Sequence, residues 1–171
     1  WQDDLKKRMP PRPKSVLKDA VDTIRPQTAL QRDDGAFETE RAVKRWKQHR
    51  RTDRPYFMYI HYQEPHSIYF PPLPFRKPFF SGNSWQASKY LQFDHMDYFA
   101  GNTAFRQSDV EAYRALYDGE IAYLDWRLQR LFEFLDEPDT VWVITADHGE
   151  LFGENGFFWH AFCLYEPLIR V

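Results

Sequence analysis

The chain has 171 residues, enough for one domain or for part of a larger one. Its composition, 43% hydrophobic and 28% charged with a net charge of −2, is that of a folded protein rather than a disordered one. It has no apolar run of about 18 residues that could cross a membrane. Its one cysteine, Cys163, excludes an internal disulfide framework and a multi-cysteine zinc site.

Charge is unevenly distributed. Residues 1–54 hold 15 Lys and Arg against 9 Asp and Glu, whereas residues 55–171 hold 8 against 16. A basic segment before an acidic one is compatible with a nucleic-acid-binding arm. Because the basic residues are scattered and no nucleic-acid-binding motif occurs, we interpret them as a solvated linker and helix face and expect no nucleic acid partner. The chain begins at Trp1 and ends at Val171 inside an apolar run, which indicates a piece of a longer protein.

The sequence of the first third of the chain predicts one irregular segment followed by one helix. Residues 1–35 are rich in proline and sustain no apolar period. Asp34 is placed to cap a helix over residues 36–49, whose apolar positions are Phe37, Val43 and Trp46.

Residues 56–62 predict a buried strand, because they follow a proline and are rich in aromatic and β-branched residues. Alternation assigns the even-numbered residues of this segment to one face and the odd-numbered residues to the other. Both faces are largely apolar, which is typical of a central strand that is covered on both sides.

Residues 67–108 predict one long loop that holds many of the chain's aromatic residues. Such a loop usually has a function or conceals a missed element. One hypothesis is that it covers the substrate cleft and sets specificity; the alternative is that its rings simply pack over the fold. His95 lies in this loop among carboxylates, and we assign it to the surface.

A helix is predicted over residues 109–135, because apolar residues recur there in steps of three and four. A second buried strand is predicted over residues 140–146. The order of helices and strands indicates an α/β fold, in which chemistry gathers beyond the carboxyl ends of the strands. Polar residues stand at both of these ends: Glu64, His66, Asp147 and His148.

Several of these side chains are of types that bind metal ions or take part in catalysis. Asp147 and His148, followed by Gly149, are suited to bind Ca²⁺, Mg²⁺, Mn²⁺ or Zn²⁺, although a turn with local hydrogen bonds would also explain them. His66 is suited to bind an anion or transfer a proton, or else to cap a carbonyl group. His160 has apolar neighbours and, taken alone, fits a packed histidine. Cys163 also has apolar neighbours, which predicts a packed and inert thiol.

Three segments resemble the sulfatase family of the alkaline phosphatase superfamily. They are residues 55–66 (PYFMYIHYQEPH) with Tyr69 and Pro71-Pro72, residues 117–121 (YDGEI) with Asp125, and residues 145–150 (TADHGE) with the following GENG, Trp159-His160 and Leu164-Tyr165-Glu166.

The resemblance implies a three-layer α/β/α alkaline-phosphatase-like fold. Residues 1–171 would form part of a single catalytic domain, with residues 1–35 irregular and residues 36–171 its α/β portion. It implies that Asp147 and His148 bind a divalent metal ion, with Ca²⁺ preferred and Mn²⁺, Mg²⁺ or Zn²⁺ as alternatives, and that His66 and His160 act as catalytic residues on a sulfate ester.

The position of His160 is a lysine in many sulfatases, and the Asp-His pair also occurs in phosphonate monoester hydrolases, so a phosphate ester substrate stays open. Cys163 does not match the C/S-x-P/A-x-R signature that is converted to formylglycine, and we expect that nucleophile in an N-terminal part of the family outside this sequence. The alternatives are a phosphodiesterase, a phosphonate hydrolase, a phosphoethanolamine or phosphoglycerol transferase, and a non-catalytic binding module on the same fold.

Overall fold

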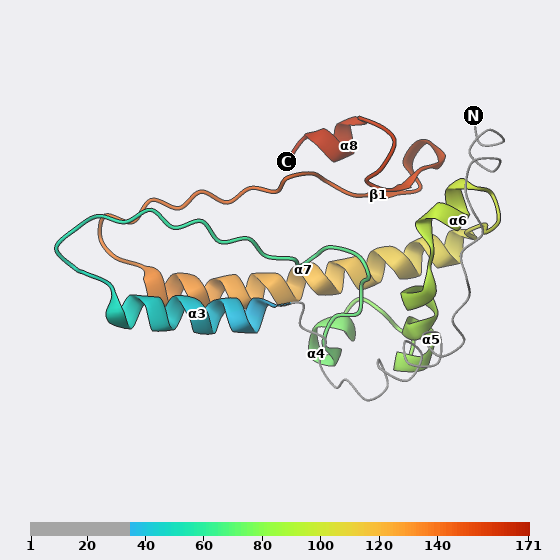
Figure 1. Ribbon diagram of the computed structural model, residues 1–171. Helices are drawn as coiled ribbons and strands as arrows, with labels where there is room; N and C mark the ends of the chain where they lie inside the picture. The colour runs from blue at the N-terminus through green and yellow to red at the C-terminus, as the bar shows by residue number, and fades with distance from the viewer. Residues whose placement is uncertain (1–34) are drawn as a thin grey trace, which may run out of the picture.

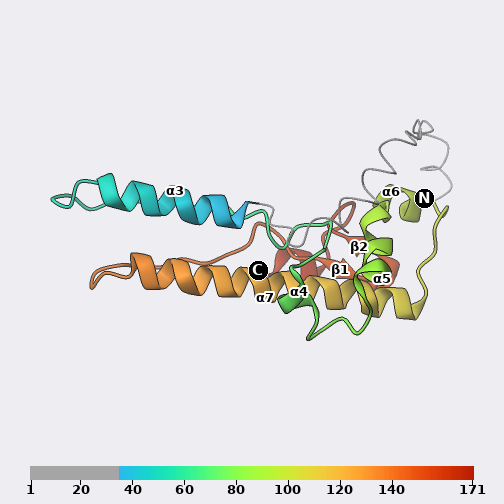
Figure 2. The same cartoon turned by 90° about the horizontal axis from the view of Figure 1, so that it is seen from below.

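The computed structural model describes residues 35–171, and two long parallel helices lie side by side in it (Figure 1). Helix α3 (Ala36–His49) lies beside the C-terminal half of helix α7 (Gln107–Leu135), as Figure 2 also shows. The sequence predicts α3 at the observed bounds and α7 with a slightly later start. The predicted cap, Asp34, and the predicted irregular segment before it lie outside the described residues.

A buried carboxylate joins these two helices. Glu40 on α3 is 3% exposed and accepts hydrogen bonds from Lys44, at 2.5 Å, and from Arg127 on α7, at 3.0 Å. Burial alone would raise the pKa of Glu40, but the bonds from Lys44 and Arg127 lower it overall. The apolar part of the contact consists of Val43 packed against Leu131 and Leu135.

Glu64, which the sequence groups with His66, Asp147 and His148, instead has a structural role at the start of α3. Its buried carboxylate accepts a hydrogen bond from the backbone N–H of Ala36, with 3.2 Å between Oε1 and N. The first N–H groups of a helix have no partner within the helix and favour a negative charge. Glu64 therefore anchors the segment 56–64 to the start of α3.

The prediction of a buried strand over residues 56–62 is wrong in its burial, although its alternation is present. Figure 1 draws the segment as an extended trace without a strand arrow. The even-numbered residues Met58, Ile60 and Tyr62 pack against the pair α3 and α7, whereas Phe57 and Tyr59 are 93% and 77% exposed. A strand needs a neighbouring strand in a β-ladder, and the one sheet among the described residues, β1 with β2, does not include this segment.

Residues 140–146 also form no strand, which corrects the second prediction. Val141 and Val143 are 86% and 84% exposed, and Trp142 contacts Phe132 on α7 with 4.5 Å between ring centroids. The β-branched composition of this segment favours a strand, but composition cannot provide the second face or the ladder partners that bury one.

The predicted loop over residues 67–108 contains four short helices: α4 (Leu73–Arg76), α5 (Ser84–Ser88), the 3₁₀ helix η1 (Lys89–Gln92) and α6 (His95–Phe99). Their start signals are local. Asn83 and Gln86 form a capping box at α5, and the Asp94 carboxylate accepts from the backbone N–H groups of Met96 and Asp97 at α6. These caps were visible in the sequence, but the dense prolines nearby favoured a loop.

Most aromatic rings of this segment pack into the main apolar core. Tyr69, Phe70 and Phe80 are buried against Tyr113 and Leu116 of α7, together with Phe152 and Phe158. The packing hypothesis therefore accounts for these rings. A role of the segment in substrate specificity stays a prediction.

Gly119 on α7 allows α4 and its flanking prolines to approach closely. A Cβ atom at this position would lie 2.6 Å from Pro71 Cγ and 3.3 Å from the carbonyl oxygen of Phe75. We expect Gly119→Ala to lower the free energy of unfolding by up to about 2 kcal/mol, because overpacking costs about 1–3 kcal/mol and the gain in helix propensity offsets about 1 kcal/mol. Urea unfolding would measure this, with the exposed Asp125→Ala on the same helix as the control; equal stability of the two variants would contradict it.

The C-terminal part forms a small hairpin that the sequence did not indicate. Strand β1 (Leu151–Phe152) pairs antiparallel with β2 (Phe158–Trp159), with Leu151 opposite Trp159, and the 3₁₀ helix η2 (Glu154–Gly156) forms the turn. Helix α8 (Glu166–Ile169) follows. Within residues 35–171, no helix combines the length and the apolar character needed to cross a bilayer.

Candidate active site

The structure brings together the four predicted site residues from three separate segments. The rings of His148 and His160 stack with 4.1 Å between their centroids, and the ring of His66 lies 5.3 Å from that of His160. The carboxylate of Asp147 lies 3.8 Å from Nε2 of His148. Their catalytic and metal-binding roles stay predictions.

Gly149 fixes the backbone next to the predicted metal ligands. Its N–H donates to the carbonyl of Leu168 at 2.8 Å, and a Cβ atom would lie only 1.9 Å from the carbonyl oxygen of Pro167. Only glycine permits this approach of α8. The segment that carries Asp147 and His148 is thereby held against the C-terminal helix.

Two of the histidines have a defined tautomer. Nδ1 of His66 lies 2.8 Å from the carbonyl oxygen of Ser67, and Nδ1 of His148 lies 2.9 Å from that of Gly149. Because a carbonyl oxygen only accepts, each Nδ1 carries the hydrogen, and Nε2 of the neutral ring holds a lone pair. This arrangement leaves Nε2 of His148 able to bind a metal ion and Nε2 of His66 able to accept and transfer a proton.

Asp147 and His148 fit a divalent cation as part of a ligand set. Slight desolvation acts to raise the pKa of Asp147, but the charge of His148 and backbone hydrogen bonds lower it overall, so the carboxylate is ionised at neutral pH. Within the described part of the chain, no group of three or more His, Cys, Asp or Glu side chains is arranged to hold a metal ion. Ca²⁺ takes about 6–8 oxygen ligands and zinc about four ligands, so these two residues supply only a fraction of either set.

Sequence reasoning missed Glu150, which is buried beside the histidines. The hydroxyl of Tyr69 donates to Oε2 of Glu150 at 2.6 Å, and Nδ1 of His160 lies 3.3 Å from both carboxylate oxygens. Burial raises the pKa of Glu150 to about 7, against the opposing effects of the bond from Tyr69 and the charge of His148. Burial also lowers the pKa of His160 to about 4, with repulsion from His148 and the other histidines adding to it.

His95 is part of this region, which corrects its assignment to the surface. Its Nε2 lies 3.1 Å from the hydroxyl oxygen of Tyr113, and its ring stacks on Trp159 with 4.8 Å between centroids. Burial lowers the pKa of His95 to about 4, with Asp94 acting against this shift and His66 acting with it. No sequence signal indicated this position, because the contacts come from α7 and from the hairpin.

The pKa of His95 predicts a loss of stability in acid. Since the folded state binds this proton more weakly than the unfolded state, the contribution of His95 is complete above about pH 6.5 and is lost as the pH falls toward about 4. Between pH 7.5 and 4.5 the free energy of unfolding of the wild-type protein should therefore decrease. We expect this decrease to be smaller in His95→Gln by up to about 2–3 kcal/mol. Urea unfolding of the full-length protein at both pH values would test this, with the exposed His49→Gln as control; an unchanged pH dependence in His95→Gln would contradict it.

Cys163 is partly exposed rather than packed, and its neighbours Phe162 and Leu164 are 48% and 84% exposed. The prediction of a packed cysteine is therefore wrong, because its apolar neighbours in sequence do not cover it in space.

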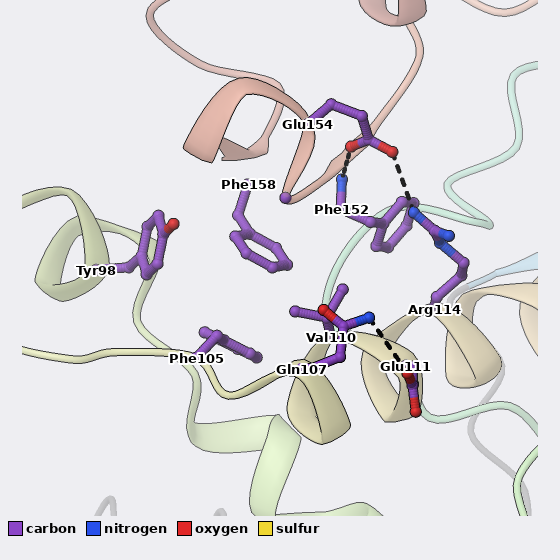
Figure 3. A pocket seen from close by; sticks show the side chains of 10 residues that line it. Tyr98, Phe105, Gln107, Val110, Glu111, Arg114, Phe152, Glu154 and Phe158 are labelled. Carbon is purple, nitrogen blue, oxygen red and sulfur yellow. Dashed lines mark hydrogen bonds and ion pairs between the residues drawn. The ribbon is translucent and has the colours of Figure 1, made fainter.

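A surface pocket of about 380 Å³ lies between the hairpin and the first turns of α7 (Figure 3). Phe105, Phe152 and Phe158 contribute apolar walls, and Arg114 pairs with Glu154 at 3.0 Å along its rim. No predicted site residue lines this pocket, so it is separate from the histidine cluster.

Comparisons with known proteins identify the family of the chain. The family model described as Sulfatase matches residues 13–171. The chain is 27% identical over 147 residues to the multifunctional alkaline phosphatase superfamily protein PehA of Trinickia caryophylli, an alignment that covers 71% of this chain. It spans only 28% of that relative. No solved structure shows significant similarity.

The match and the motifs around the histidines define a member of the alkaline phosphatase superfamily, with its α/β fold. The chain belongs to the sulfatase family. The described residues form a helical part of that fold with one small antiparallel sheet.

Proposed function

We propose that the chain is part of the single catalytic domain of a metal-dependent sulfuric ester hydrolase, a sulfatase that cleaves sulfate esters. The observation that supports this most is the gathering of His66, His148 and His160 beside the ionised Asp147. Family membership makes an ester the expected substrate.

In this proposal Asp147 and His148 hold the divalent metal ion, with Ca²⁺ preferred and Mn²⁺, Mg²⁺ or Zn²⁺ as alternatives. When bound, such an ion polarises the sulfuryl oxygens. Nδ1 of His148 stays bonded to the carbonyl of Gly149, which orients Nε2 as the ligand atom.

His66 and His160 act on the ester. Because Nδ1 of His66 is bonded to the carbonyl of Ser67, its Nε2 is the atom that contacts the ester; after Nε2 has accepted a proton, the imidazolium donates that proton to the leaving oxygen. His160, whose ring lies next to those of His66 and His148, contacts the sulfuryl group. The attacking group, expected to be formylglycine, lies outside this sequence.

A second candidate function is hydrolysis of a phosphate or phosphonate ester. Two observations favour it: the Asp-His pair, and a histidine, His160, where many sulfatases carry lysine. The similar protein PehA is named as a multifunctional member of the superfamily, which is consistent with either substrate class.

Kinetics on the full-length protein would separate these functions. The metal-free protein would be assayed with p-nitrophenyl sulfate, bis(p-nitrophenyl) phosphate and p-nitrophenyl phenylphosphonate, before and after addition of Ca²⁺ or Mn²⁺. A metal-restored kcat/KM that is highest for the sulfate ester supports the sulfatase. A preference for a phosphorus ester supports the second candidate, and no turnover of any ester would overturn both in favour of a non-catalytic binding module.

A further inference from the structure

The carboxylate of Glu150 is buried between two aromatic side chains that it joins. Its side chain is 7% exposed, and that of His160 is 15% exposed. One carboxylate oxygen accepts the hydroxyl hydrogen of Tyr69 at 2.6 Å, and both oxygens lie 3.3 Å from Nδ1 of His160. Burying a carboxylate is costly unless it is hydrogen-bonded, so these contacts account for its place in the interior.

Tyr69 is itself rigidly held. It is fully buried, and its ring lies 4.8 Å from that of Tyr113 and 5.1 Å from that of Tyr117, centroid to centroid. Both partners are on α7, the longest helix. The hydroxyl of Tyr69 therefore supplies a fixed point to which the carboxylate of Glu150 is bonded.

The hairpin brings His160 to this carboxylate. Leu151 pairs with Trp159, so the residues just outside that pair, Glu150 and His160, come next to each other in the antiparallel register. Trp159 has a φ of 70°, a left-handed conformation that is costly for a bulky residue, immediately before His160. The backbone therefore places the imidazole of His160 next to Glu150, although this requires the unfavourable left-handed conformation of Trp159.

We propose that Glu150, held by Tyr69, is a positioning residue that fixes the ring of His160 through Nδ1 and so presents Nε2 to the bound ester, an inference that rests on the proposed function. Without the carboxylate, the hydrogen bond that fixes Nδ1 of His160 is lost, and the ring can flip so that either nitrogen faces the ester. Loss of a group that orients an active-site histidine typically costs about 10- to 100-fold in activity.

A double-mutant cycle in the full-length protein tests the inference, with the ester that the wild-type protein hydrolyses best as the probe. We expect Glu150→Ala to lower kcat/KM by about 30- to 100-fold, Glu150→Gln to retain most of the activity because its amide still bonds to the ring, and Tyr69→Phe to lie between them. In the His160→Ala background, Glu150→Ala should have no further effect, since it acts only through His160. Glu154→Ala, on the same hairpin, is the control for hairpin integrity and should leave kcat/KM unchanged.

The possible failures are distinguishable. If Glu150→Ala lowers activity equally with and without His160, Glu150 acts by another route and the inference is overturned while the proposed function stands. If His160→Ala has no effect on the turnover of any ester, the proposed role of His160 fails. A readout independent of turnover is the ¹⁵N NMR spectrum of the histidine rings: we expect the Nδ1 and Nε2 signals of His160 to change in Glu150→Ala and not in Glu154→Ala, and unchanged signals would overturn the inference.

Discussion

Replacing Asp147 or His148 by alanine in the full-length protein is expected to lower kcat/KM for its ester substrate by at least about 10³-fold, which corresponds to about 4 kcal/mol of transition-state stabilisation. Affinity for the divalent metal ion is expected to fall by at least about 100-fold, because a direct ligand contributes no less than the groups that orient it. The physical reason is that these two side chains are close together and oriented, with Asp147 ionised and Nδ1 of His148 already bonded.

Steady-state kinetics and isothermal titration with Ca²⁺ and Mn²⁺ would measure both effects. Matched controls are Asp139→Ala and His49→Ala, which remove the same kinds of side chain from exposed positions away from the histidine cluster. A folded Asp147→Ala or His148→Ala variant with wild-type turnover would refute the metal-ligand assignment. It would favour the alternative, in which these residues only form local hydrogen bonds in a turn.

Residues 1–171 expressed alone are expected to hydrolyse aryl sulfates at least about 10³-fold more slowly than the full-length protein, since removal of a nucleophile costs at least that much. This follows from the expectation that the formylglycine and the remaining metal ligands lie outside this sequence. The same comparison should show weak binding of Ca²⁺ and Mn²⁺ by the chain alone. Turnover by residues 1–171 near the rate of the full-length protein would show that the nucleophile has been misplaced, and Cys163 would then need to be tested by substitution.

The isolated chain is also expected to self-associate, because the segment 140–146 exposes strand-forming residues with no ladder partner among residues 35–171. Val143→Lys should reduce the aggregated fraction in sedimentation velocity experiments. Gln129→Lys adds the same charge on an exposed position of α7 and should have a smaller effect. Equal effects of the two substitutions would mean that net charge, rather than this segment, controls association.

Local sequence determined the two long helices. The amphipathic period of α7 and the break after α3 depend on neighbours within one or two turns, so both helices occur close to their predicted bounds. The same local logic gave the alternating faces of residues 56–62. The sequence motifs also identified His66, Asp147, His148 and His160 as candidate residues, and the structure places them together.

Tertiary structure decided what these local patterns could not. Whether residues 56–62 and 140–146 are buried depends on which segments lie beside them, and that information is not contained in their own composition. The positions of Glu150 and His95 in the site likewise depend on segments that are distant in sequence. Glu150 meets His160 only because β1 pairs with β2 in one register, and His95 reaches Trp159 and Tyr113 only because α6 packs between the hairpin and α7. A hydrogen bond between residues far apart in sequence is a property of the assembled fold, and its partners are fixed only when the helices and the hairpin have packed.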